Sequence, residues 1–413
     1  MELAEFLVQG QQLRQQNRTS AIAYFEQCLQ NVSDNSDQDL IMTARTLLDL
    51  AIELMATKQP QNLKRATKLV QQAGNALHHN FKTESLALDL ELDNEHEAYL
   101  LYAQGILALE LGELRDVLNI LQGAYAAYGN NLEGQSLIDD AIAHYYLKVG
   151  DLQSALMHFE RSLSVRLEIE DECAIAKSYA YLGQLYLLSG DINQANSLSQ
   201  NTLDIALVNA DNSLRLLALK GLGKVAIAEH QWQTAIATIK DAICLLKEPI
   251  DSIEIGHLYC DLAESLLGDR QIEDSLICIR INALPRFRDY QYQTGIAIAK
   301  HIRGRIYVHR LLDGLDSSLD EDAIETAEDS LLDAAMGFEQ LGMMSNYAKV
   351  LYDLACLYQL CSNSQYQYQY QYQGKALRSL ELALSVLDQL DMSNSQLASQ
   401  VEGMLNQVMH NSF

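Results

Sequence analysis

The sequence predicts an all-α protein built as an α-solenoid of stacked helix–turn–helix units. Three observations lead to this fold class. Similar segments recur every 40 residues, apolar residues within them recur at helical spacing, and only three prolines interrupt the 413 residues. A single helix pair of this kind cannot bury its apolar stripe alone, so the units must stack into one continuous core.

Four units carry the period without slippage. In each, a large apolar residue stands in the first helix, at Ile142, Leu182, Leu222 and Leu262. A small residue follows directly, at Ala143, Gly183, Gly223 and Ala263. A second small residue lies 12 positions further on, at Ala155, Ala195, Ala235 and Ser275. Small residues allow helix axes to approach closely, so these positions mark where the helices of a unit cross.

Weaker copies of the pattern extend the array in both directions to about nine units, at 10–29, 47–73, 102–124, 302–338 and 351–387. The last periodic segment, 395–409, has one apolar stripe and is expected to be the helix that caps the solenoid. We therefore expect four segments: degenerate repeats in 1–130, four regular repeats in 131–290, two repeats with expanded turns in 291–390, and a capping helix and tail in 391–413.

A run of alternating glutamine and tyrosine occupies residues 365–373 in the last unit. The two small residues of that unit, Ala355 and Ala376, are 21 positions apart instead of 12, and the excess equals the length of the run. The run is therefore predicted to be an insertion in the turn between two helices, where extra length is tolerated. Three interpretations stay open: a lengthened loop without a role, a tyrosine strip that adds a strand to a partner or self-associates, and a short hairpin without a role.

Composition and charge disfavour several classes of function. The net charge of −26 disfavours binding to nucleic acid or to an anionic membrane, because phosphates would be repelled over most of the surface. No apolar run approaches the length of a membrane span, and the start of the sequence lacks the pattern of a secretory signal. Seven scattered cysteines are expected to be reduced thiols of a cytoplasmic protein.

No constellation in the sequence assembles catalytic chemistry. The segment 221–226, GLGKVA, lacks the hydroxyl residue of a phosphate-binding loop, and no histidine or cysteine cluster has the spacing of metal ligands. We therefore expect no catalytic residue, no metal and no cofactor.

The segments 142–163 and 181–195 carry a leucine or isoleucine, a small residue, a later tyrosine and a second small residue, and in this they resemble the tetratricopeptide repeat. A 40-residue spacing resembles the long-helix variant of that repeat. The departures are Arg270, which stands near the usual glycine, and the absence of a trailing proline in the four units. The resemblance implies a right-handed superhelix that binds protein or peptide in a concave groove lined by the first helix of each unit.

Residues one turn apart on those first helices would share the groove, at Asp140, His144, Lys177, Gln184, Lys220, Lys224 and Glu264. Lys177, Lys220 and Lys224, with His144, would form a small basic spot inside an acidic protein. By resemblance, concave lysines in this family often receive a carboxylate, commonly the C-terminus of a peptide. Solvated lysines without a ligand are the alternative.

A second basic window lies between residues 278 and 310, with one acidic residue, Asp289. Its cations are Arg280, Arg286, Arg288, Lys300, Arg303, Arg305 and Arg310. They either neutralise the neighbouring acidic loop 313–322 or form a docking patch for an acidic partner. Arg303 is expected to face inward, where it would need a carboxylate partner.

Taken together, the sequence predicts a non-enzymatic scaffold or adaptor that binds a protein or peptide, with an acidic segment or a C-terminal carboxylate as the expected contact. The alternative is a ligand-responsive sensor array in signal transduction, which controls a separately encoded enzyme or transcription factor. The sequence indicates neither the identity of the partner nor the oligomeric state.

Overall fold

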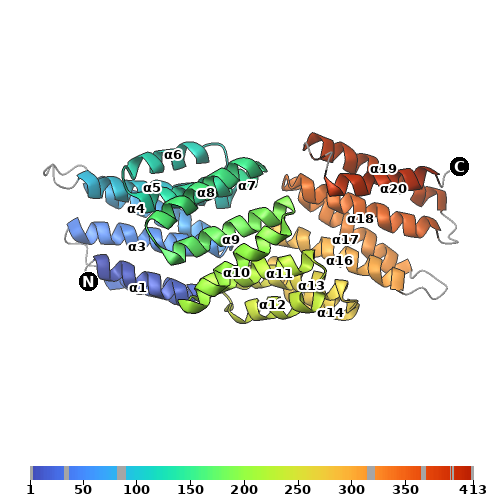
Figure 1. Cartoon of the computed structure of the whole chain (residues 1–413), viewed down its shortest axis with the longest axis horizontal. Helices are drawn as coiled ribbons and strands as arrows, with labels where there is room; N and C mark the ends of the chain where they lie inside the picture. Colours follow the sequence, from blue (N-terminus) through green and yellow to red (C-terminus); the bar gives the residue numbers. More distant parts are fainter. Residues whose placement is uncertain are drawn as a thin grey trace. The chain divides into compact units, whose positions relative to one another are not determined.

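The computed structural model describes residues 3–31, 37–80, 90–313, 321–363, 369–390, 392 and 395–410. Every regular element in these ranges is a helix, so the predicted all-α solenoid is confirmed (Figure 1). Contacts divide the chain into two compact units, Met1–Glu254 and Ile255–Phe413. The four segments predicted from the sequence, 1–130, 131–290, 291–390 and 391–413, do not share the boundary between these two units. That division stays a prediction.

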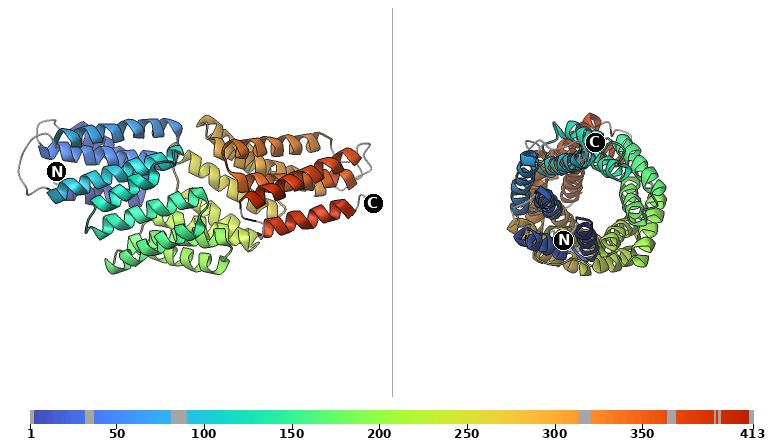
Figure 2. Two further views of the ribbon diagram at one scale, coloured as in Figure 1. Left: turned by 90° about the horizontal axis from the view of Figure 1, so that it is seen from above. Right: turned by 90° about the vertical axis from the view of Figure 1, so that its left-hand side faces the viewer.

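The first unit is a succession of helix pairs. In order they are α1 (Leu3–Gln16) and α2 (Arg18–Asn31), α3 (Asp37–Ala56) and α4 (Pro60–Asn80), α5 (Leu90–Leu111) and α6 (Val117–Ala127), α7 (Leu132–Val149) and α8 (Leu152–Glu168), α9 (Glu172–Ser189) and α10 (Ile192–Val208), and α11 (Asn212–Ala228) and α12 (Trp232–Cys244). The right-hand panel of Figure 2 shows these helices following one another around a ring, from blue through green to yellow-green.

Aspartate and asparagine side chains begin the helices of the regular units. The N-cap carboxylates of Asp151, Asp171 and Asp191 accept hydrogen bonds from the backbone N–H groups of Ser154, Ala174 and Gln194. Asn131 and Asp211 cap α7 and α11 in the same way. Each cap satisfies an N–H group that has no partner within its helix, so the repeated acids fix where the helices start.

The predicted small residues lie where helices cross. Ala143, Ala155, Ala195 and Ala235 are buried in the first unit. A Cβ atom added at Gly223 would lie 2.9 Å from Ile239 Cγ1 on α12, which leaves no room for a side chain. These contacts explain why both small positions recur in each repeat, since the two helices of every pair must approach one another equally closely.

The second unit contains most of α13 (Ser252–Gly268), followed by a helix in three parts, α14 (Ile272–Ile277), the π-helical η1 (Cys278–Ala283) and α15 (Leu284–Asp289). Pro285 lies just after the π turn. Proline has no N–H to donate to the preceding turn, and a locally wider turn accommodates it. The Arg286 guanidinium donates to the Asn282 carbonyl at 2.5 Å, which satisfies one backbone group of this distorted region.

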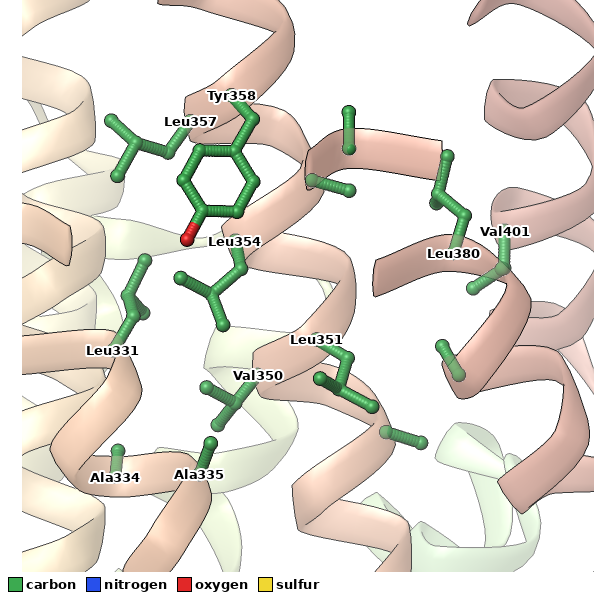
Figure 3. Close-up of a cluster of buried hydrophobic side chains, with 14 of the residues drawn as sticks. Leu331, Ala334, Ala335, Val350, Leu351, Leu354, Leu357, Tyr358, Leu380 and Val401 are labelled. Carbon is green, nitrogen blue, oxygen red and sulfur yellow. The ribbon is translucent and has the colours of Figure 1, made fainter. Parts of the chain in front are cut away.

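The remaining helices of the second unit are α16 (Gln293–Asp313), α17 (Glu321–Gln340), α18 (Met344–Asn363), α19 (Gln369–Gln389) and α20 (Gln396–His410). Figure 3 shows their shared core, to which Leu331 of α17, Leu354 of α18 and Leu380 of α19 belong. Val401 of α20 is buried against the same cluster, so the predicted C-terminal helix covers the last repeat.

The structure corrects the prediction that the whole glutamine–tyrosine run lies in a turn. Residues 364–368 lie outside the described residues, but 369–373 form the start of α19. Tyr372 stacks on Tyr358 of α18, with ring centroids 6.2 Å apart, and Lys375 lies over both rings. Helix formation wins over the alternating pattern here because the tyrosine gains an aromatic partner inside the last repeat.

Candidate functional site

The predicted groove residues of the first unit lie on the first helices of three consecutive regular pairs. Asp140 and His144 lie on α7, Lys177 and Gln184 on α9, and Lys220 and Lys224 on α11. Glu264 lies on α13 within the second unit. The structure thus brings six of the seven residues into one stack of helices, although their side chains differ in exposure.

Lys177, Gln184 and Lys224 are exposed. Among the described residues, neither Lys177 nor Lys224 has an ion-pair partner. Lys220 is half-buried and forms an ion pair with Glu254, so its charge is already balanced within the unit. The cationic surface that is open to a ligand therefore consists of Lys177 and Lys224, with Gln184 as a neutral hydrogen-bonding group on the same helix as Lys177.

Asp140 is buried and paired rather than open. Its Oδ2 accepts a hydrogen bond from Arg166 Nη2 of α8 at 2.6 Å, and Arg166 Nη1 donates to Ser178 Oγ of α9 at 2.7 Å. This buried ion pair connects three helices from two consecutive repeats. Removing one partner would leave the other charge buried without compensation, so the group holds the stack together.

His144 lies in the same buried region. Its ring meets those of Phe159 and Tyr181 edge-on, at centroid distances of 5.3 and 4.8 Å. Burial lowers the pKa of His144, and the opposing effect of Asp140 does not restore it. The imidazole is therefore neutral near pH 7 and adds no charge to the basic spot.

In the second unit, Glu264 forms an ion pair with Arg305 of α16. Arg305 lies 3.9 Å from Asp353 Oδ2 of α18, which also accepts from His301 at 2.6 Å. Two predicted sites therefore share one ion pair, because Glu264 was assigned to the groove and Arg305 to the basic patch. The pair connects helices of consecutive repeats and leaves neither charge uncompensated.

The other cations of the basic window differ in their surroundings. Lys300 forms an ion pair with Asp333 at 2.7 Å, and Arg310 lies 3.8 Å from Glu273. Arg286 is held by the Asn282 carbonyl and lies over the ring of Tyr259. Arg280 and Arg288 are exposed and have no ion-pair partner within the described part of the chain.

The sequence predicts a carboxylate partner for Arg303, but in the structure its Nε donates a hydrogen bond to the Ser330 hydroxyl at 2.8 Å. The acidic partners of this window lie on α13, α14, α17 and α18. Residues 314–320 of the acidic loop lie outside the described residues, so its predicted role is left as a prediction.

A charge network at the start of the chain was not predicted. Asp49 of α3 is buried and accepts hydrogen bonds from Arg14, Arg45 and the Tyr99 hydroxyl. Burial alone would raise the pKa of Asp49, but Arg45 and Arg14 outweigh it and hold the pKa below its usual range. Only the i, i+4 spacing of Arg45 and Asp49 signals this network in the sequence.

The described residues show no cluster of three or more metal-binding side chains, and none of their helices is long and apolar enough to cross a bilayer. A pocket of about 340 Å³ lies between α19 and α20, lined by Leu384, Ser385, Leu387, Asp388, Ala398 and Glu402. It contains no predicted site residue.

No protein-family model matches the chain, and no curated protein matches it in sequence. Solved structures do match its fold. A Rap protein complexed with competence and sporulation factor is 13% identical, and the match covers 90% of this chain and 98% of that chain with a TM-score of 0.56. Aspartyl phosphate phosphatase F from Bacillus subtilis is 13% identical over 91% of this chain and 92% of its own, with a TM-score of 0.54.

The apo form of RapI is similar over 91% of this chain and 96% of its own, at 12% identity and a TM-score of 0.51. The chain has a tetratricopeptide-type fold. At this level of identity the likeness describes the fold alone. In the tetratricopeptide-type array, Lys177, Gln184 and Lys224 are the predicted groove residues that remain accessible.

Proposed function

We propose that this protein is a non-enzymatic adaptor that binds a protein or peptide on the face formed by α7, α9 and α11. The observation that carries the proposal is the pair of exposed lysines, Lys177 and Lys224, on consecutive first helices of a chain with a net charge of −26. Neither has an ion-pair partner among the described residues, so both can receive a carboxylate. Gln184 adds a hydrogen-bond donor and acceptor beside them.

The comparisons support a binding role of this kind. A protein with the same fold has been solved in complex with competence and sporulation factor. In the present chain, the buried pair of Asp140 with Arg166 and the neutral His144 serve the framework, and the two lysines supply the charge. Two open lysines on a rigid framework fit an extended peptide segment that carries acidic side chains or a free C-terminal carboxylate.

The test is an array of acidic peptides, each made once with a free C-terminal carboxylate and once amidated. We expect Lys177→Ala with Lys224→Ala to weaken binding by about 100-fold or more, because each of the two charged hydrogen bonds contributes about 1.5–3 kcal/mol. Amidation should weaken binding to the wild-type protein if the terminal carboxylate is the group received.

The matched control removes two exposed lysines one turn apart on α4, by Lys64→Ala with Lys68→Ala. This variant has the same change in net charge and should bind as the wild type does. Equal losses in both double variants would show that overall charge, and not this face, determines binding, and would overturn the proposal.

A further inference from the structure

The first unit closes on itself. Its first helix, α1, lies against α11, and the Asn212 side-chain amide donates to the Gln16 carbonyl at 3.4 Å. These residues are 196 positions apart in the sequence. The ring of helices in the right-hand panel of Figure 2 is therefore joined by specific contacts between its beginning and its end.

The turn after α12 makes the more extensive closing contacts. Arg18 Nη1 of α2 lies 3.0 Å from Asp251 Oδ1. Gln59, just before α4, donates from Nε2 to the carbonyls of Pro249 and Ile250, at 2.8 and 3.0 Å. The Ile250 side chain packs against the core cluster formed by α1–α5. One short turn, residues 245–251, thus contacts the start of the array by charge, hydrogen bond and apolar packing.

Asp251 has two roles in this closure. While Oδ1 faces Arg18, its Oδ2 accepts a hydrogen bond from the backbone N–H of Lys247 at 2.9 Å, so the same carboxylate fixes the shape of the turn. Arg18 also lies 3.9 Å from Glu53 Oε2, and Glu53 accepts from Arg14 at 2.7 Å. The closing contact is therefore continuous with the charge network of α1 and α3.

The closing contacts are mostly polar, with Ile250 as their apolar member, whereas consecutive helices meet through apolar clusters. Phe25 of α2, Leu54 of α3 and Ala66 of α4 are buried in one apolar cluster. By contrast, the Arg18 side chain in the closing ion pair is 27% exposed, and Gln59 and Asn212 contribute hydrogen bonds. Partly exposed ion pairs are weakened by salt, and regions with few apolar contacts open before the core does.

We propose that the contacts of α1, α2 and the α3–α4 turn with α11 and with residues 245–251 form a clasp, which closes the first unit and governs access to the face of α7, α9 and α11. The clasp opens by separation of Arg18 from Asp251, of Gln59 from the 249–250 carbonyls and of Ile250 from the α1–α5 cluster, while the apolar contacts between consecutive helices stay intact. Separation of these contacts frees the start of the chain from α11, which is one of the three helices of that face. This inference rests on the proposed function for the ligand, but the clasp itself is a property of the free protein.

The test is hydrogen exchange measured by mass spectrometry on the full chain without ligand. In the double variant Arg18→Ala with Gln59→Ala, we expect at least 10-fold faster exchange in 3–31 and 245–251, with α7–α10 unchanged. In the wild-type protein, 1 M salt should accelerate the same segments. Arg65→Ala is the matched control, because its exposed ion pair with Glu26 joins α4 to α2 and does not contact the turn.

Unchanged exchange in 3–31 and 245–251 would overturn the clasp, and so would an increase spread evenly over the first unit. Arg18→Lys, which keeps the charge, should exchange more slowly than Arg18→Ala, and equal rates would exclude the ion pair as the closing contact. The peptide array is then repeated with the open double variant. If no peptide binds either form while exchange changes as expected, the proposed function fails and the clasp stands.

Discussion

At the scale of single residues, the turn between the two helices of each regular repeat places one residue in the left-handed backbone conformation. Gly150 and Gly190 adopt φ values of 86°, and the same position in the next two units holds His230 and Arg270, with φ values of 59° and 61°. A residue with a side chain is strained in this region by about 1–2 kcal/mol, and glycine is not. Arg270, which replaces the usual glycine at this position, therefore lowers the stability of the folded chain through backbone strain.

We expect Arg270→Gly to raise the free energy of unfolding by about 1 kcal/mol, because glycine relieves the strain but has more freedom in the unfolded chain. Arg270 is exposed, so little packing is lost. Chemical denaturation measures the change. Arg270→Ala is the control, since it removes the same side chain and keeps the strained backbone. A gain as large in alanine as in glycine would show that the arginine side chain, and not φ, is responsible.

The half-buried imidazole of His144 makes stability depend on pH. Burial holds its pKa below the ordinary value of 6.5, so the unfolded chain binds the proton more readily. The stabilisation is complete above about pH 6.5 and is lost as the pH falls toward the depressed pKa of the folded state. We expect the midpoint of thermal unfolding to drop between pH 7.5 and 5.5, and the drop to be smaller in His144→Gln.

Asp140 and Glu110 oppose the depression of the His144 pKa, and Lys58 and Lys148 add to it. The control variant is His230→Gln, which removes an exposed imidazole and should retain the wild-type dependence on pH. Identical pH dependence in His144→Gln and the wild type would contradict the assignment.

The same residues show which features of the candidate site could be predicted from the sequence. Helical spacing correctly placed Asp140 and His144 together on one helix, and Lys177 and Gln184 on the next. Spacing says nothing about what covers a side chain. Arg166, which neutralises Asp140, comes from α8, and His144 is flanked by Phe159 of α8 and Tyr181 of α9. Burial by distant residues is therefore what the pattern could not reveal.

At the scale of helices, Phe287 shows how three elements of the second unit approach one another. Its ring lies between two glycines, where a Cβ added at Gly256 of α13 would be 2.7 Å from Cε1 and one at Gly295 of α16 would be 2.4 Å from Cδ1. Phe287 is fully buried, and it cannot move without disturbing one of the two helices. The absence of side chains at the two glycines thus allows α15 to pack between α13 and α16.

We expect Gly295→Ala to lower the free energy of unfolding by about 1–3 kcal/mol through overpacking against Phe287. Gly374→Ala on α19 is the matched control, because no atom lies within 4 Å of the added Cβ. There the substitution should stabilise the protein by about 0.5–1 kcal/mol, as expected for a helical glycine replaced by alanine. Chemical denaturation of both variants gives the comparison. Equal effects at the two positions would show that helix propensity, and not contact with Phe287, sets the outcome.

The helices themselves were largely predictable, with two exceptions. The π turn of η1 has no periodic signal, because one extra residue in a turn changes the spacing only locally, and Pro285 is its sole marker. The glutamine–tyrosine run alternates like a strand, yet residues 369–373 are helical. Tyr372 gains Tyr358 and Lys375 as neighbours in that conformation, and such a long-range gain overrides a local pattern.

At the scale of the whole molecule, each of the two units has apolar clusters of its own. Phe159 belongs to a cluster of the first unit, and Phe338 to the large cluster of α16–α20. We expect Phe338→Ala to destabilise its unit by about 3–5 kcal/mol and to accelerate hydrogen exchange in α16–α20 while α1–α10 keep wild-type rates. Phe159→Ala should give the reverse pattern. Faster exchange throughout the chain in either variant would show that the units unfold together.

The architecture followed from the period, but the closure of the first unit did not. A repeat specifies how each pair packs on the next, and it does not specify where the chain returns after several pairs. Arg18 and Asp251 are 233 positions apart and belong to different helix–turn–helix repeats. Neither residue stands out in its own segment, because the partner that gives it meaning becomes a neighbour only after the whole ring has formed.

The helical start of α19 has a consequence for how this gene can change. Short tandem repeats lengthen and shorten readily during DNA replication, here by whole glutamine–tyrosine steps. Any such step leaves a tyrosine three positions before Lys375, because every second residue of the run is tyrosine. We therefore expect homologous genes to differ in the number of steps upstream of Gln369 while each retains the ring that meets Tyr358.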